Sequence, residues 1–113
     1  LGIGRNAHIA FNEPGSDFNS RTRKVDLTET TKQDNAKFFD GEMPEYAVTQ
    51  GIATIMQADR LLLLATGSSK ANAIGSIFEK SSKTPAAMLR EHRDVTLMLD
   101  AEAASEVPKD RID

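Results

Sequence analysis

Residues 61–66 read LLLLAT, an apolar run of strand length that contains no charged residue. A strand with one solvated face alternates apolar and polar residues, whereas a strand of a parallel sheet is covered on both faces and reads as a continuous apolar run. The run therefore predicts a buried parallel strand. Residues 95–99, VTLML, predict a last strand further along the chain.

Strand-like and helix-like patterns alternate around these two runs. Residues 1–4, LGIG, read as the end of a buried strand, and residues 24–27 alternate like a short one. Helices are expected over residues 28–39, from the turn at residues 67–70 to about residue 78, and over residues 84–91. Thr28 supplies an N-cap for the first of them, and Pro85 opens the last.

A further helix is expected to begin at Pro44, where the missing N–H of proline costs little. Val48, Ile52, Ile55 and Met56 then recur at the three- and four-residue spacing of one apolar helical face. This face should pack on the sheet.

The alternating order predicts an α/β fold, a three-layer αβα arrangement with a mainly parallel, Rossmann-like sheet and right-handed connections. Residues 1–4 show a strand end with no residues before it to begin the strand. A parallel sheet needs further strands beside this one, so we expect the chain to lack the N-terminal strands of its sheet. Residues 1–113 are expected to form part of one domain.

The composition bounds the function. The chain has 113 residues, 39% of them hydrophobic and 27% charged, which suits one globular domain. A net charge of -3 gives no basic surface for nucleic acid or an anionic membrane, and no apolar run approaches the roughly 18 to 20 residues that cross a bilayer. With no cysteine and two distant histidines, a zinc site is not expected, and a cytoplasmic setting is the default.

A candidate catalytic loop follows residues 1–4. His8 and Glu13 lie five residues apart among turn-forming residues, at the point where a strand would open into a loop. A histidine can transfer protons near neutral pH, and a nearby carboxylate can fix its tautomer and stabilise its charged form. In the alternative, His8 caps a turn and Glu13 is solvated, and the spacing alone leaves both readings open.

A second candidate is TGSSK, residues 66–70, at a strand-to-helix junction. The backbone N–H groups of such a turn favour a phosphate, and Lys70 could add a full charge. The glycine spacing of a Walker loop is missing, so a plain N-cap by Ser68 or Ser69 is an equal alternative. Further cations, which either bind anions or form a solvated face, are Arg21, Arg23 and Lys24, and separately Lys37.

Residues 1–15, LGIGRNAHIAFNEPG, closely resemble the signature of the glucosamine-6-phosphate deaminase family, in which glycine commonly stands at the place of Ala7. The likeness continues through residues 20–23, 35–39, 44–49, 66–70 and 85–89, and so spans nearly the whole chain. If the backbone φ at Ala7 is positive, a methyl group there costs roughly 1 kcal/mol, and if φ is negative it costs nothing.

The resemblance implies conversion of glucosamine 6-phosphate and water into fructose 6-phosphate and ammonia, with no metal or organic cofactor. In this family the counterpart of His8 assists sugar-ring opening, and the residues matched by Asn6 and Glu13 orient it. Some members carry aspartate at the place of Asn6. Because asparagine supplies no charge, Glu13 would stabilise the imidazolium alone, and a narrower or shifted pH profile is expected.

Lys70 matches a family lysine that binds the substrate phosphate, and Lys37 matches a position where arginine commonly does so. Lysine keeps the charge but loses the bidentate fork of arginine. The family aspartate that moves a proton between carbon atoms lies in the half of the protein that this chain would lack, so residues 1–113 alone should be nearly inactive. The oligomeric state, including a homo-oligomer, stays open.

Two alternatives to a deaminase remain at this point. One is a related sugar-phosphate isomerase or lactonase of the same fold, which would release no ammonia. The other is a sugar-phosphate-binding module that has lost catalysis, a reading suggested by Ala7, Lys37 and the expected missing half. In each case the expected partner is a small sugar phosphate.

Overall fold

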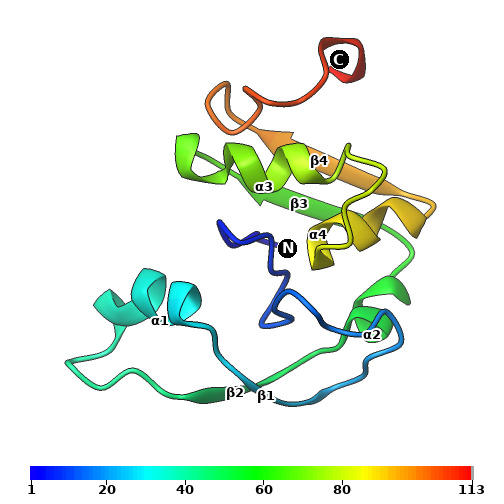
Figure 1. Cartoon of the computed structure of the whole chain (residues 1–113). Helices are drawn as coiled ribbons and strands as arrows, with labels where there is room; N and C mark the ends of the chain where they lie inside the picture. The colour runs from blue at the N-terminus through cyan, green and yellow to red at the C-terminus, as the bar shows by residue number, and fades with distance from the viewer. Residues whose placement is uncertain (113) are drawn as a thin grey trace.

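The computed structural model describes residues 1–112, in which strands and short helices alternate (Figure 1). The strands are β1 (Arg23–Asp26), β2 (Tyr46–Thr49), β3 (Leu61–Ala65) and β4 (Val95–Leu99). The α-helices are α1 (Glu29–Asn35), α2 (Ile52–Met56), α3 (Ala71–Ser76) and α4 (Pro85–Met88). Single 3₁₀ turns are η1 (Ala36–Phe38), η2 (Ser68–Lys70), η3 (Leu89–Glu91) and η4 (Lys109–Arg111). Within residues 1–112, every helix is too short or too polar to cross a membrane.

The parallel pair predicted from the two apolar runs is confirmed. Strands β3 and β4 pair in parallel, with Leu61 opposite Val95. On the other edge of β3, the Leu1 amino group donates to the carbonyl oxygen of Leu62 at 2.7 Å, and the Leu64 N–H donates to the carbonyl oxygen of Leu1 at 2.9 Å. Residues 1–4 therefore begin beside β3, as a parallel neighbour would, although they are not themselves a regular strand.

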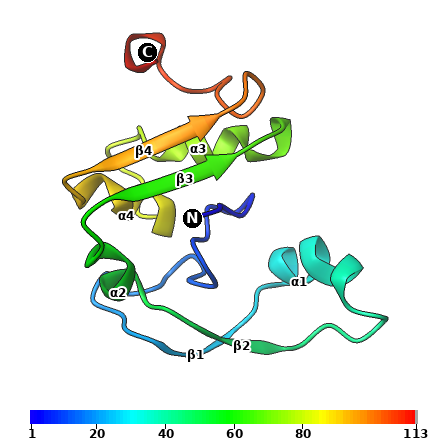
Figure 2. The same ribbon diagram turned by 180° about the vertical axis from the view of Figure 1, so that it is seen from behind.

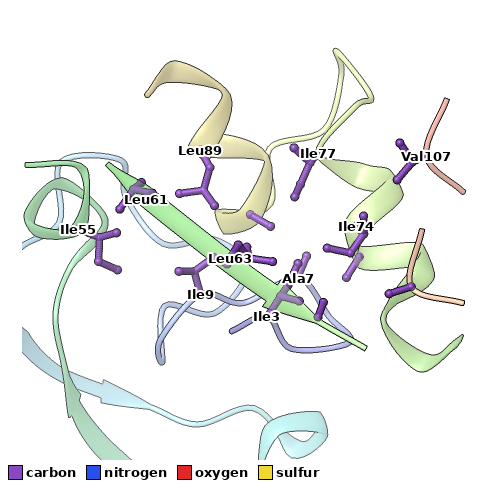
Figure 3. Packing of buried hydrophobic residues seen from close by; sticks show 14 residues of the cluster. Ile3, Ala7, Ile9, Ile55, Leu61, Leu63, Ile74, Ile77, Leu89 and Val107 are labelled. Atoms are coloured by element: carbon purple, nitrogen blue, oxygen red, sulfur yellow. The ribbon is translucent and has the colours of Figure 1, made fainter. Parts of the chain in front are cut away.

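One face of this sheet carries the core. Leu61, Leu63 and Ala65 are buried, and Figure 3 shows Leu63 facing the side chains of α3 and of the segment after α4. The same cluster includes residues from the N-terminal loop, among them Ile3, Ala7 and Ile9. The opposite face is open in residues 1–112, where Leu62 is 46% and Leu64 52% exposed. The sequence predicted that both faces of β3 would be covered. Within the described residues, other segments cover only the face that carries Leu61, Leu63 and Ala65.

The helix expected from Pro44 is wrong over its first half. Residues 46–49 form β2, which pairs antiparallel with β1 so that Val48 lies opposite Lys24. Val48 is 72% exposed, whereas Ile52 and Ile55 are buried in the helix α2 that follows. Tyrosine, valine and threonine favour strands, and pairing with β1 outweighs the helical spacing that linked Val48 to the apolar face of α2.

The other helices begin near where the sequence predicts and end sooner. Thr28 caps α1 by accepting a hydrogen bond from the Thr31 N–H at 3.2 Å, but the α-helix stops at Asn35 and continues as the 3₁₀ turn η1. Residues 84–91 divide in the same way into α4 and the turn η3, whereas in residues 67–78 the 3₁₀ turn η2 precedes α3. Strand β1 begins one residue earlier than expected. Tightening to 3₁₀ geometry is common at helix ends.

The start of α4 generates a prediction about stability. Thr84 is its N-cap and accepts a hydrogen bond from the Ala87 N–H at 3.2 Å, with Pro85 in the first turn. We expect Thr84→Ala to lower the free energy of unfolding by about 1 kcal/mol, because the N–H loses its partner. Thr84→Ser should keep most of the stability. Denaturant titrations of the two variants would check this, and equal losses would show that the hydroxyl does not act as a cap.

Candidate active site

His8, Lys37 and Lys70 line one cavity of about 370 Å³ together with Asp34 and Phe38. The segments that carry them come from separate parts of the chain: the N-terminal loop, the end of α1 with η1, and η2 after β3. Figures 1 and 2 show the N-terminal segment running between α1 and the β3–β4 pair. The predicted site residues are His8, Asn6, Glu13, Lys37 and Lys70, and the structure places three of these five, His8, Lys37 and Lys70, around this cavity.

The loop before His8 is a tight turn. The Gly4 N–H donates to the carbonyl oxygen of His8 at 3.0 Å, and the Ala7 N–H donates to that of Gly4 at 2.8 Å. The Ala86 N–H in turn donates to the carbonyl oxygen of Ala7 at 3.0 Å, which ties the turn to α4. A Cβ atom on Gly4 would lie 2.0 Å from Cε1 of His8, so the imidazole packs directly against this glycine.

The backbone is left-handed at two alanines on either side of His8. Ala7 has φ 68° and Ala10 has φ 52°. For Ala7 this decides between the two alternatives left by the sequence: φ is positive, and the methyl group carries a cost of roughly 1 kcal/mol. The Ala7 side chain is buried in the core cluster, which offsets part of that cost. The left-handed Ala10 was not predicted.

The contacts of Asn6 fix the tautomer of His8. Nδ1 of the imidazole lies 2.7 Å from Oδ1 of Asn6, the same oxygen that accepts the His8 backbone N–H at 3.3 Å. An amide oxygen only accepts, so Nδ1 carries the proton. Oε1 of Glu13, another acceptor, lies 3.2 Å from Nδ1. The neutral ring therefore has its lone pair on Nε2.

Glu13 is buried, and its carboxylate accepts two hydrogen bonds from the start of α1. Its Oε2 accepts the Thr28 backbone N–H at 2.7 Å, and its Oε1 accepts the Thr31 hydroxyl at 2.9 Å. Burial alone raises the pKa of the Glu13 carboxyl, but the hydrogen bonds from Thr28 and Thr31 and the neighbouring His8 outweigh it, so the net pKa is lowered. Glu13 is thus ionised, and the reading in which it is a solvated side chain is wrong.

His8 is held mainly in its neutral form. Burial lowers the pKa of the imidazole below its ordinary value, and Lys70 acts in the same direction. Glu13 and Asp34 raise the pKa, but their effect is smaller than that of burial. A neutral imidazole with a free Nε2 can act as a base near neutral pH.

The two lysines are supported differently. Lys70 ends η2, and its Nζ donates to the carbonyl oxygen of Ile3 at 2.7 Å. Neither 3₁₀ turn η2 nor helix α3 has a side-chain N-cap, so the alternative in which Ser68 or Ser69 caps a helix is wrong. Lys37 lies in η1 with its Nζ 5.2 Å from the centre of the Phe38 ring.

Three contributors to the site were missed by the sequence reading. Thr31 is fully buried, and its hydroxyl oxygen lies 3.2 Å from Nδ1 of His8. Arg5 and Asp34 form an ion pair beside the cavity, with Nε of Arg5 2.8 Å from Oδ2 of Asp34. The pairs Thr31–His8 and Arg5–Asp34 are separated by 23 and 29 residues, beyond the reach of local spacing rules.

Other sequence candidates lie outside this cluster. Arg23 donates from Nη1 to Oδ1 of the buried Asn12 at 2.8 Å, so it supports the loop rather than standing in solvent. His92 contacts backbone groups through both ring nitrogens and therefore has a structural role. Among residues 1–112, no group of three histidine, aspartate or glutamate side chains is placed to hold a metal ion.

A titration of His8 tests the electrostatics of the site. We expect the midpoint of its NMR signals, identified with a His8→Gln variant, to fall below the ordinary value of 6.5. Because the unfolded chain then binds more protons than the folded one, stability should decrease as the pH falls from about 6.5 toward this midpoint. A midpoint above 6.5 would show that Glu13 outweighs burial.

The contact between Gly4 and His8 can be tested by adding one methyl group. Gly4→Ala should force the imidazole out of its position, lower the free energy of unfolding by about 1–3 kcal/mol, and move the pKa of His8 toward 6.5 as the ring becomes solvated. Gly2→Ala is the matched control, because its Cβ would meet no atom within 4 Å. NMR titration and denaturation would measure both effects, and identical behaviour of the two variants would contradict the packing argument.

Comparison with known proteins identifies the family of the chain. Residues 1–98 match the family described as glucosamine-6-phosphate isomerases/6-phosphogluconolactonase. The chain is 50% identical over 109 residues to the glucosamine-6-phosphate deaminase of Ligilactobacillus salivarius, covering 93% of this chain and 47% of that protein. It is also 50% identical over 109 residues to glucosamine-6-phosphate deaminase 1 of Bacillus subtilis, covering 93% and 45%.

Solved structures give the same picture. A monomeric glucosamine-6-phosphate deaminase superposes with a TM-score of 0.89 at 49% identity, over 94% of this chain and 46% of the other. The 6-phosphogluconolactonase of Trypanosoma brucei superposes with a TM-score of 0.73 at 28% identity, over 96% and 41%. The chain spans about half the length of these relatives. It belongs to the family of glucosamine-6-phosphate isomerases and 6-phosphogluconolactonases.

Proposed function

We propose that the complete gene product converts glucosamine 6-phosphate and water into fructose 6-phosphate and ammonia, and that residues 1–113 are the C-terminal part of its single catalytic domain. The observation that carries the proposal is the common cavity of His8, Lys37 and Lys70. It combines a neutral base with two cations, as a phosphorylated sugar requires. The relatives at about 50% identity are named as deaminases of this substrate.

His8 would open the sugar ring. Its Nε2 lone pair can accept the proton of the anomeric hydroxyl, and the imidazolium can return a proton to the ring oxygen as the bond from C1 to that oxygen breaks. Asn6 and Glu13 position the ring through Nδ1. Because Asn6 is uncharged, burial keeps His8 neutral over a wider pH range than a second carboxylate would allow. We assign proton transfer between C2 and C1 to a group outside residues 1–113.

Lys70 and Lys37 would hold the phosphate. Lys70 is oriented by the carbonyl oxygen of Ile3, and Lys37 enters from the end of α1, so the two charges reach the cavity from different supports. Two ammonium groups offer charge without the bidentate geometry of arginine. The proposed partner is therefore a small sugar phosphate, and the proposed setting for its turnover is the cytoplasm.

The second candidate is lactone hydrolysis. It is favoured by the structural likeness to the lactonase of Trypanosoma brucei, which is weaker in both identity and TM-score than the likeness to the deaminase. A sugar-phosphate-binding protein without turnover is a third outcome. The three are separated by their products: ammonia with fructose 6-phosphate, a hydrolysed lactone, or none.

The test supplies the complete gene product with glucosamine 6-phosphate and measures ammonia and fructose 6-phosphate together. We expect equimolar release, reduced at least tenfold in kcat by His8→Ala, since a positioned proton-transfer group typically contributes about 10²–10⁴-fold. His92→Ala is the matched control, because this histidine contacts backbone groups away from the cavity. Substrate binding without either product would overturn the proposal.

A further inference from the structure

Asp34 is the one acidic side chain, among the described residues, that lines the cavity with Lys37 and Lys70. Its carboxylate accepts hydrogen bonds from Nε of Arg5, which lies 2.9 Å from Oδ1 and 2.8 Å from Oδ2. The pair is part-exposed, with side-chain exposures of 44% for Arg5 and 33% for Asp34. A negative charge at the mouth of a phosphate site is unexpected, because it competes with the phosphate for the same cations.

The field of Asp34 reaches the functional groups. The hydrogen bond from Arg5 does most to lower the pKa of the Asp34 carboxyl, and Lys70 and His8 contribute in the same direction. Asp34 therefore acts electrostatically on Lys70, whose Nζ also donates to the carbonyl oxygen of Ile3. Without Arg5, the Asp34 carboxylate, which lines the same cavity as Lys70, would attract that ammonium group unopposed.

We propose that Arg5 is a positioning residue for phosphate binding: by holding and neutralising the Asp34 carboxylate at the edge of the cavity, it leaves Lys70 and Lys37 free for the phosphate. The inference rests on the proposed function of this cavity. Within residues 1–112, the hydrogen bonds of the Arg5 side chain go to Asp34, and Arg5 is proposed to act through this carboxylate. Its contribution is thus a balance of charge rather than a contact with substrate.

The competing explanation is that the ion pair, here called a clasp, has only a structural role, because it also joins the N-terminal loop to α1. The two explanations predict different double-mutant behaviour. A clasp is broken equally by removing either partner, and removing both restores nothing. A charge balance is upset in opposite directions by the two single changes, and it returns when both charges are removed.

The experiment uses the complete gene product as wild type, Arg5→Ala, Asp34→Asn and the double variant. Calorimetry measures the affinity for inorganic phosphate and for glucosamine 6-phosphate, and steady-state kinetics measure KM and kcat. We expect Arg5→Ala to weaken binding of both ligands and to raise KM by about two- to fivefold with a smaller change in kcat, the size of effect that a surface ion pair gives. Asp34→Asn should tighten binding, and the double variant should return to within about twofold of the wild type.

Arg93→Ala is the matched control. Arg93 forms a similar exposed pair with Asp59, at 2.9 Å, but lines a different cavity, so its loss should leave phosphate affinity unchanged. The proposal is overturned if Arg5→Ala has no effect, or if Asp34→Asn weakens binding as much as Arg5→Ala and the double variant shows no recovery. Calorimetry needs no turnover, so a protein that binds sugar phosphate without releasing ammonia would refute the proposed reaction while still deciding the role of Arg5.

Discussion

The buried carboxylate of Glu13 is the interaction on which the site depends. It accepts the N–H of Thr28 at the start of α1 and the hydroxyl of Thr31 in its first turn, and it lies beside Nδ1 of His8. One ionised group therefore caps a helix and orients an imidazole. Without it, two buried donors would lose their acceptor, at a cost of about 1–3 kcal/mol each, and the loop would lose its connection to α1.

This connection explains how the two lysines meet. Lys70 is carried by the sheet, because η2 begins shortly after β3, whose inward face is buried. Lys37 belongs to the outer segment of β1, α1, η1 and β2, which Figure 2 shows reaching away from the β3–β4 pair. The bonds from α1 to Glu13 join these two supports close to the cavity. The relative position of the two lysines, which form the proposed phosphate site, thus depends on a carboxylate that does not line the cavity.

Sequence reasoning captured the features that depend on neighbouring residues. The parallel pair followed from continuous apolar runs, and the starts of α1 and α4 from Thr28 and Pro85, because each is governed by local chemistry. The strand β2 was missed because its residues also fit a helical face, and only pairing with β1 decides between the two. The contact of Thr31 with His8 joins residues far apart in the chain, and no local pattern signals it.

The family resemblance supplied what spacing could not. The resemblance of residues 1–15 to the family signature predicted that His8, Asn6 and Glu13 act together. The structure places these three side chains in mutual contact. The resemblance gave no indication of Arg5 or Asp34, whose pairing depends on how α1 lies against the loop.

The left-handed backbone at Ala7 and Ala10 restricts the evolutionary paths open to the loop. Glycine occupies such conformations freely and alanine at a modest cost, whereas a β-branched side chain would be strongly disfavoured. Ala7 is also enclosed by the core, so a larger residue would have to satisfy backbone and packing constraints together. Sequence drift at this position is therefore confined to the smallest side chains, whatever substrate the cavity comes to accept.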